Sequence, residues 1–279
     1  MKIGIVGLGL IGGSLGLDFR ALNKHTVIGV SRRPETCAKA IQRGVVDDAH
    51  TDITFVASAD VIFICTPIAY IASTVEQLIP HLSSTTILTD VGSVKASIVR
   101  TVEPLWPNFV GGHPMAGTAE SGIDAALSKL FVDRAYVITP TQKTPPDSIA
   151  MIESLARSLH SKTYICTPDD HDRAVAWISH LPVMVSASLI EACLNEPSDD
   201  VLILARTIAS SGFRDTSRVG GGNPELGMMM ARYNRDEVVR SLKAYQTQLS
   251  TITQCIETES WSELEEILQH TQTSRSAFL

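Results

Sequence analysis

A glycine-rich stretch, GIVGLGLIGGSLG at residues 4–16, lies almost at the start of the 279-residue chain. The apolar residues KIGIV before it predict a short strand, and SLGLDFRAL after it has apolar residues at helical spacing. Gly7, Gly9 and Gly12 therefore fit the G-x-G-x-x-G spacing on a strand-to-helix turn. Such a turn can bring backbone N–H groups close to a phosphate, and the helix N-terminus adds partial positive charge. We expect it to hold a pyrophosphate, whereas the alternative is a tight turn that binds nothing.

Strand-like and helical patterns alternate along the first part of the chain. The expected strands are 26–30, 59–67, 85–93, 108–117, 135–140 and 162–166, and the expected helices are 34–44, 69–82 and 149–160. Near-continuous apolar strands that alternate with helices predict a parallel sheet covered on both faces, as in a Rossmann-type doubly wound α/β domain.

The pattern changes near residue 166, after which only helices are expected. Their ranges are 169–194, 198–210, 224–232, 235–257 and 261–275. We therefore predict a dinucleotide-binding Rossmann domain over residues 1–166. An all-α domain for substrate binding and dimerisation is predicted over residues 167–279.

Composition excludes several classes of partner. The net charge of −7 gives no basic footprint for nucleic acid. The sequence contains no run of about 18 consecutive apolar residues, so we expect no membrane span. The five cysteines are scattered without metal-ligand or redox spacing, and the N-terminus has no secretory signal. We expect a cytoplasmic protein with free thiols, no bound metal and a small-molecule substrate.

The end of the second strand indicates which dinucleotide is bound. Enzymes that use NAD place an acidic residue there, about 20 residues after the glycines, to hold the ribose 2′-hydroxyl. Here the position reads Ser31-Arg32-Arg33, with no carboxylate to repel a 2′-phosphate and two guanidinium groups to grip it. The alternative is a pair of solvated surface arginines. We predict NADP.

Polar residues at the carboxyl ends of the strands are candidates for the chemistry, because ligands of open α/β sheets bind there. They are Thr66, Ser93 in DVGSVK, Lys95, and His113 in GGHPMAG. Removal of hydride from an alcohol needs a base, and histidine can accept a proton near neutral pH. A lone histidine is more often structural, but His113 lies between glycines at a strand end of a cofactor-binding domain.

The motifs GLGLIGGSLG, CTP, DVGSVK, GGHPMAGT, SHLP and SGFRDTSR, in this order over nearly the whole chain, resemble the TyrA family of prephenate and arogenate dehydrogenases. HPMAG together with FRDTSR is the most specific part. We expect no fused mutase or regulatory domain in so short a chain, and by this resemblance it is most similar to arogenate dehydrogenases of the cyanobacterial type.

This resemblance implies an oxidative decarboxylation. A cyclohexadienol ring loses hydride from its carbinol carbon to NADP, a ring carboxylate leaves as CO2, and the ring becomes aromatic as tyrosine or 4-hydroxyphenylpyruvate. By resemblance, His113 would accept the proton of the ring hydroxyl and Ser93 would orient that hydroxyl. Arg218 would anchor a substrate carboxylate.

Further contacts follow from the same resemblance. Thr118 and His180 would contact substrate, although a packing role for His180 before Pro182 remains equally open. The residues implied in cofactor binding are Gly7, Gly9, Leu10, Ile11, Gly12, Ser31, Arg32, Arg33, Thr66 and Pro67. The family also implies a homodimer joined through the helical domains, in agreement with the surplus apolar residues of VLILARTIA and LGMMMA.

Two departures from the family pattern bear on the substrate. Val183 stands where many prephenate enzymes have the last histidine of SHLPH, and Gly227 stands where many have an aromatic residue. We therefore expect a preference for arogenate, with Glu120 or Asp124 as a candidate partner of its ammonium group or simply a surface residue.

Three alternatives remain open. One is a prephenate dehydrogenase, and another is a β-hydroxyacid dehydrogenase. An enzyme of the latter kind needs a catalytic lysine, and the helical half has only Lys243. The third is a non-enzymatic NADPH-binding sensor.

Overall fold

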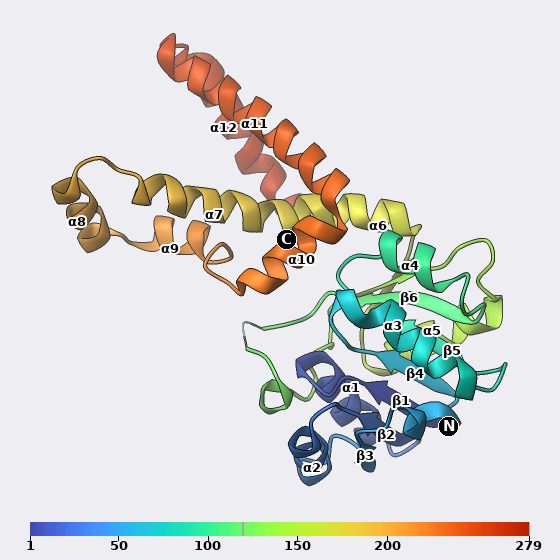
Figure 1. The fold of residues 1–279 in the computed structure, drawn as a ribbon. Coiled ribbons are helices and arrows are strands. Elements are labelled where there is room, and N and C mark those ends of the chain that lie inside the picture. The colour runs from blue at the N-terminus through green and yellow to red at the C-terminus, as the bar shows by residue number, and fades with distance from the viewer. Residues whose placement is uncertain (119, 279) are drawn as a thin grey trace. The chain divides into compact units, whose positions relative to one another are not determined.

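The computed structural model describes residues 1–118 and 120–278, and the chain divides into two compact units, Met1–Asn234 and the part from Arg235 onward. The first unit contains an eight-stranded sheet in the order β3-β2-β1-β4-β5-β6-β7-β8 (Figure 1). Its strands are β1 (Lys2–Val6), β2 (Thr26–Val30), β3 (Asp48–His50), β4 (Val61–Ile64), β5 (Ile87–Asp90), β6 (Phe109–Pro114), β7 (Ala135–Thr139) and β8 (Lys162–Ile165).

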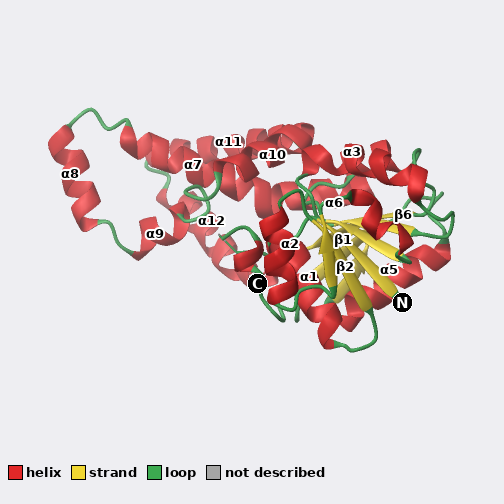
Figure 2. Cartoon of the chain, turned by 60° about the horizontal axis from the view of Figure 1, so that its bottom comes forward, coloured by secondary structure: helices red, strands yellow, loops and turns green. Residues whose placement is uncertain are grey.

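Helices cover both faces of this sheet, as Figure 2 shows. They are α1 (Leu10–Ala21), α2 (Pro34–Gln42), α3 (Ile68–Leu78), α4 (Ala96–Val102) and α5 (Pro146–Ser158). Alternate strand residues point to opposite faces, so Phe63 packs with α1, α2 and α5 while Ile62 and Ile64 pack with α3 and α4. The expected α/β fold class is confirmed.

The expectation of a purely parallel sheet is wrong at one edge. The pairs from β3 to β6 are parallel, but β6 and β7 are antiparallel, with His113 opposite Val137. A parallel pair needs a crossover that returns the chain to the same end of the sheet. Among its described residues, the β6–β7 connection contains no helix beyond the short turn Ile123–Ala125. Strand β7 runs back along β6, and β8 then pairs parallel to β7.

Up to residue 278, the regular elements that follow β8 are all helical. In the first unit they are α6 (Pro168–Val175), a π-helical turn (Ala176–His180), α7 (Leu181–Leu194), α8 (Asp199–Ile208), α9 (Ser211–Ser217) and α10 (Pro224–Tyr233). The second unit contains α11 (Arg235–Glu257) and α12 (Trp261–Ser274). The expected change to helices is confirmed, while the domain boundary at residue 166 stays a prediction.

The continuous helix Pro168–Leu194, formed by α6, the π turn and α7, is unusually apolar. Among the described residues it is the one helix that could cross a membrane by length and composition, with a mean hydropathy of 1.4 in its most apolar window. In this structure 17% of that window is buried. The helix carries the buried, hydrogen-bonded polar residues His171, Asp172 and His180.

Candidate active site

The glycine turn has the geometry of an anion site. Gly7 has a φ of +101°, and a Cβ atom there would lie 2.6 Å from the Cys65 carbonyl oxygen. A Cβ atom at Gly12 would lie 2.0 Å from the Gly7 carbonyl oxygen, so α1 can approach the turn only with glycine at this position. At Gly9, by contrast, a Cβ atom would meet no described atom within 4 Å, which leaves room for a ligand against the backbone.

The N-terminus of α1 is available to such a ligand. Gly9 caps the helix without a side-chain hydrogen bond, and the first turn, which begins with Leu10 and Ile11, contains no acidic residue. The first N–H groups of a helix have no partner within the helix and favour negative charge. The turn and the helix end together fit the pyrophosphate of a dinucleotide.

The other expected cofactor residues surround this turn. Ser31 follows β2 and is half-buried, whereas Arg32 and Arg33 are exposed. The Arg32 guanidinium lies 5.6 Å from the centre of the Tyr70 ring on α3, a cation–π distance that holds the side chain beside the β2 end. Thr66 and Pro67 connect β4 to α3, and the backbone nitrogen of Thr66 lies 3.1 Å from the position of a Gly7 Cβ.

A buried ion pair fixes the loop that follows β5. The Lys95 side chain is 0% exposed, and its ammonium group contacts the Asp90 carboxylate and donates to the Gly112 carbonyl oxygen at 2.7 Å. Asp90 also accepts from the backbone N–H groups of Gly92, at 2.8 Å, and Gly112, at 3.2 Å. Burial lowers the pKa of Lys95, and the adjacent Asp90 opposes this shift. Lys95 therefore ties β5 to β6.

His113 lies on β6 at one end of a chain of three side chains. It is 9% exposed, and its Nδ1 atom lies 2.8 Å from Nε2 of His171 on α6. The Nδ1 atom of His171 lies in turn 2.8 Å from Oδ1 of Asp172. Burial holds the pKa of His113 well below 6.5, and His171, Lys95 and His180 add to this effect. His113 is therefore a neutral imidazole near neutral pH.

Asp172 connects the two histidine positions of the site. Its carboxylate accepts from the backbone N–H groups of Lys95, at 2.7 Å, and Ala96, at 2.8 Å, at the start of α4. Its backbone carbonyl accepts from Nδ2 of Asn234 at 2.7 Å. The same Asn234 nitrogen lies 3.1 Å from Nδ1 of His180.

His180 ends the π-helical turn and is 0% exposed. Its Nε2 atom has no hydrogen-bond partner within the part of the chain that the structure describes. Burial lowers the pKa of His180 to about 4, so this side chain is neutral too. Pro182 follows two residues later and has no backbone N–H, which relaxes the regular helical pattern at this point.

The remaining predicted site residues are not joined to the histidines. Ser93 is half-buried in the loop between β5 and α4, Thr118 is exposed after β6, and Arg218 is exposed immediately after α9. No hydrogen bond or ion pair links these three side chains to His113 or His180 among the described residues. Asp124 pairs with Lys39 of α2 at 2.6 Å, which occupies its carboxylate, and Glu120 is exposed.

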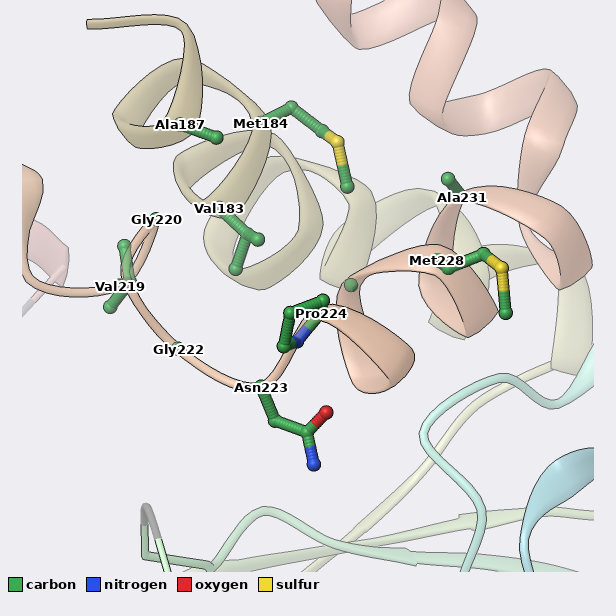
Figure 3. A pocket seen from close by; sticks show the side chains of 11 residues that line it. Val183, Met184, Ala187, Val219, Gly220, Gly222, Asn223, Pro224, Met228 and Ala231 are labelled. Carbon is green, nitrogen blue, oxygen red and sulfur yellow. The ribbon is translucent and has the colours of Figure 1, made fainter. Parts of the chain in front are cut away.

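The two positions that depart from the family pattern meet in one cavity of about 320 Å³ (Figure 3). Val183 and Met184 of α7 line it on one side, and Met228 of α10 lines it on another. A Cβ atom at Gly227 would lie 3.6 Å from Cγ1 of Val183, an ordinary contact distance. The missing side chain at 227 and the short apolar one at 183 therefore leave a mostly apolar space, whose lining also includes the amide of Asn223.

Comparison with known proteins assigns the chain to a family. Residues 15–165 match the model of the prephenate dehydrogenase nucleotide-binding domain, and residues 167–270 match that of the prephenate dehydrogenase dimerization domain. Prephenate dehydrogenase of Bacillus subtilis is 31% identical over 91% of this chain and 70% of its own length. Cyclohexadienyl dehydrogenase of Zymomonas mobilis is 29% identical over 99% of this chain and 95% of its own.

Solved structures agree with this result. The crystal structure of Synechocystis arogenate dehydrogenase has a TM-score of 0.92 and 54% identity, covering 100% of both chains. Prephenate dehydrogenase from Aquifex aeolicus, in complex with hydroxyphenyl propionate and NAD+, has a TM-score of 0.94 and 27% identity, covering 100% of this chain and 98% of its own. The resemblance noted from the motifs is confirmed: the chain belongs to the prephenate dehydrogenase family.

Proposed function

We propose that this chain oxidises and decarboxylates arogenate with NADP to form tyrosine. The observation that carries the proposal is the 54% identity with Synechocystis arogenate dehydrogenase along the full length of both chains. Prephenate is the second candidate substrate, because the Bacillus subtilis relative is a prephenate dehydrogenase. Val183, which lines the cavity, supplies no donor for the keto oxygen of prephenate, and this supports arogenate as the substrate.

In the proposed reaction His113 is the base. Its Nδ1 atom is occupied by His171, so Nε2 is left to accept the proton of the substrate hydroxyl. Bound NADP supplies the acceptor for the hydride that leaves the same carbon. With the hydroxyl deprotonated, a carbonyl forms at that carbon, and loss of the ring carboxylate as CO2 then restores aromaticity.

The other site residues orient the substrate in this proposal. Ser93 holds the ring hydroxyl toward His113, and Arg218 receives a carboxylate through its exposed guanidinium group. The unpartnered Nε2 of His180 donates to a second oxygen of the substrate, and Thr118 closes the site from the loop after β6. Substrate binding would thus give the buried His180 nitrogen its missing partner.

The activity is tested by mixing the purified chain with arogenate and NADP and following the absorbance of the reduced nicotinamide. We expect one tyrosine for each NADP reduced. Binding of NADP without turnover of arogenate or prephenate would instead indicate the sensor function and refute the proposal.

Arg32→Ala is expected to weaken NADP binding by about 10–100-fold and to leave NAD binding nearly unchanged. Hydrogen bonds to a charged group contribute about 1.5–3 kcal/mol, and only NADP carries the 2′-phosphate. Tyr70→Leu serves as a control that removes the ring beneath Arg32 but keeps the guanidinium. Titration of both cofactors measures the effect, and equal losses for NAD and NADP would refute the contact with the 2′-phosphate.

We also propose that the chain forms a homodimer through its helical part. Residues 167–270 match a dimerization domain, and α8 exposes a row of apolar side chains that includes Ile203, Leu204 and Ile208, the last of them 67% exposed. Sheltering such a face in a partner would be favourable at about 25 cal/mol per Å² of apolar surface. Sedimentation equilibrium should give twice the chain mass, and a fully active monomer would contradict this assembly.

A further inference from the structure

We propose that His171 and Asp172 are positioning residues that fix the tautomer of His113 and take up the proton it receives. This inference rests on the proposed function, because it assigns a task to the partners of the proposed base. It begins from the buried chain of contacts that runs from His113 through His171 to Asp172.

The proton positions follow from the partners at each end of this chain. The Asp172 carboxylate can only accept, so Nδ1 of His171, at 2.8 Å from it, carries a hydrogen. In neutral His171 the Nε2 atom is then an acceptor, and the hydrogen shared with His113 at 2.8 Å belongs to Nδ1 of His113. Nε2 of His113 is left with its lone pair, as a base requires.

The same contacts provide a path for the proton. When Nε2 of His113 takes the proton of the substrate hydroxyl, the Nδ1 proton of His113 can pass to Nε2 of His171. His113 is then neutral again, and the imidazolium on His171 lies against the Asp172 carboxylate. The proton is conserved through both transfers, while the hydride leaves the substrate separately for NADP.

The charges around the two rings favour this destination. Lys95, between β5 and α4, and His180, at the end of the π turn, both oppose a positive charge on His113. Asp90 is neutralised by Lys95 in a buried ion pair, whereas Asp172 faces His171 directly. Among the described residues, the Asp172 carboxylate contacts the ring of His171 and not that of His113.

A separate set of contacts fixes His180 in the opposite tautomer. The backbone carbonyl of Asp172 can only accept a hydrogen bond, so the NH2 group of Asn234 must point toward it. The same NH2 group then also faces Nδ1 of His180. Nδ1 of His180 accepts from that group, and Nε2 therefore carries the hydrogen. One lone pair at His113 and one N–H at His180 match the hydroxyl and a carboxylate or carbonyl oxygen of the proposed substrate.

The tautomers can be measured without substrate or cofactor. Ring-nitrogen NMR shifts of the whole unliganded protein should show protonated Nδ1 and unprotonated Nε2 for His113. His180 should show the reverse. A His113 ring protonated at Nε2 would overturn the proposal. The ring-nitrogen signals are assigned to each histidine by their loss in the variants His113→Asn, His171→Gln and His180→Gln.

Two variants at His171 test the effect on the reaction. His171→Gln can still accept from His113 but cannot take its proton, so we expect kcat to fall about tenfold with KM unchanged. His171→Leu removes the acceptor as well, and we expect kcat to fall about 10²–10³-fold. His81→Gln, at an exposed histidine distant in sequence, is the control with unchanged kcat.

The pH profile separates a proton path from a merely structural role. In His171→Gln the proton must remain on His113, farther from Asp172, so the acid limb of kcat should move to lower pH. An unchanged acid limb together with unchanged kcat in the Gln variant would refute the path. Failure of the wild-type chain to oxidise either substrate would refute the proposed function and leave the tautomers to be decided by NMR.

Discussion

His113→Asn is expected to lower kcat by about 10²–10⁴-fold, the usual contribution of a general base. The amide nitrogen of asparagine can replace Nδ1 as the donor to His171, so the contacts around Asp172 should persist. Asparagine has no basic nitrogen in place of Nε2, so only the base is lost. KM and the affinity for NADP should change little, as measured by steady-state kinetics and cofactor titration. A near-normal kcat at neutral pH would show that His113 is structural.

The pH dependence of the wild-type enzyme follows from the same residue. Because burial holds the pKa of His113 well below 6.5, this base remains unprotonated as the pH falls through 6.5, and kcat should stay level there. The stability of the fold, by contrast, should not stay level over the same pH range. Below pH 6.5 the unfolded chain binds a proton at this histidine that the folded chain does not bind, so the free energy of unfolding falls. Loss of kcat centred at or above 6.5 would contradict this assignment.

The sequence predicted most of the parts that depend on local patterns. Gly7, Gly9 and Gly12 identify a turn whose geometry requires glycine at Gly7 and Gly12, while Gly9 borders open space. The long helix 235–257 was predicted to the residue, since its apolar spacing persists over many turns. The direction of β7 could not be predicted, because an apolar run of five residues looks the same in either orientation.

Short elements escaped prediction because distant residues stabilise them. Helix α4 has seven residues. The backbone N–H of its first residue, Ala96, donates to the carboxylate of Asp172, which lies 76 positions later in the chain. Helix α9 also has seven residues, and the short strand β3 has three. Such segments carry too few residues for a periodic signal.

Part of the site was missed for the same reason. His113 was found because glycines mark its strand end, but its partner His171 lies 58 positions away on α6. The segment PDDHDRAV signals only the start of a helix, and nothing in it indicates which polar side chains are buried. Asn234 and Asp90 likewise acquire partners only in the folded chain.

A strong preference for arogenate is the second large effect that we expect. Prephenate and arogenate share the ring, both carboxylates and the hydroxyl. They differ in the side chain, which carries a keto group in prephenate and an ammonium group in arogenate. Discrimination must come from polar groups that are satisfied by one substrate and left unpaired by the other, which can reach about 10⁴–10⁵-fold. Val183 lines the cavity without a donor for a keto oxygen, and Gly227 leaves it open.

Val183→His should therefore raise kcat/KM for prephenate and lower it for arogenate. The imidazole restores a donor, and the space opposite Gly227 can accommodate the larger side chain. Val183→Leu enlarges the side chain without adding a donor, and it should not improve turnover of prephenate. Equal effects of the two substitutions would show that volume alone, and not hydrogen bonding, sets the preference.

The most direct test of the account is kcat/KM of the wild-type chain for arogenate and for prephenate, measured with NADP on one enzyme preparation. We expect arogenate to be favoured by about 10⁴-fold. Turnover of prephenate equal to or better than that of arogenate would contradict the proposed substrate.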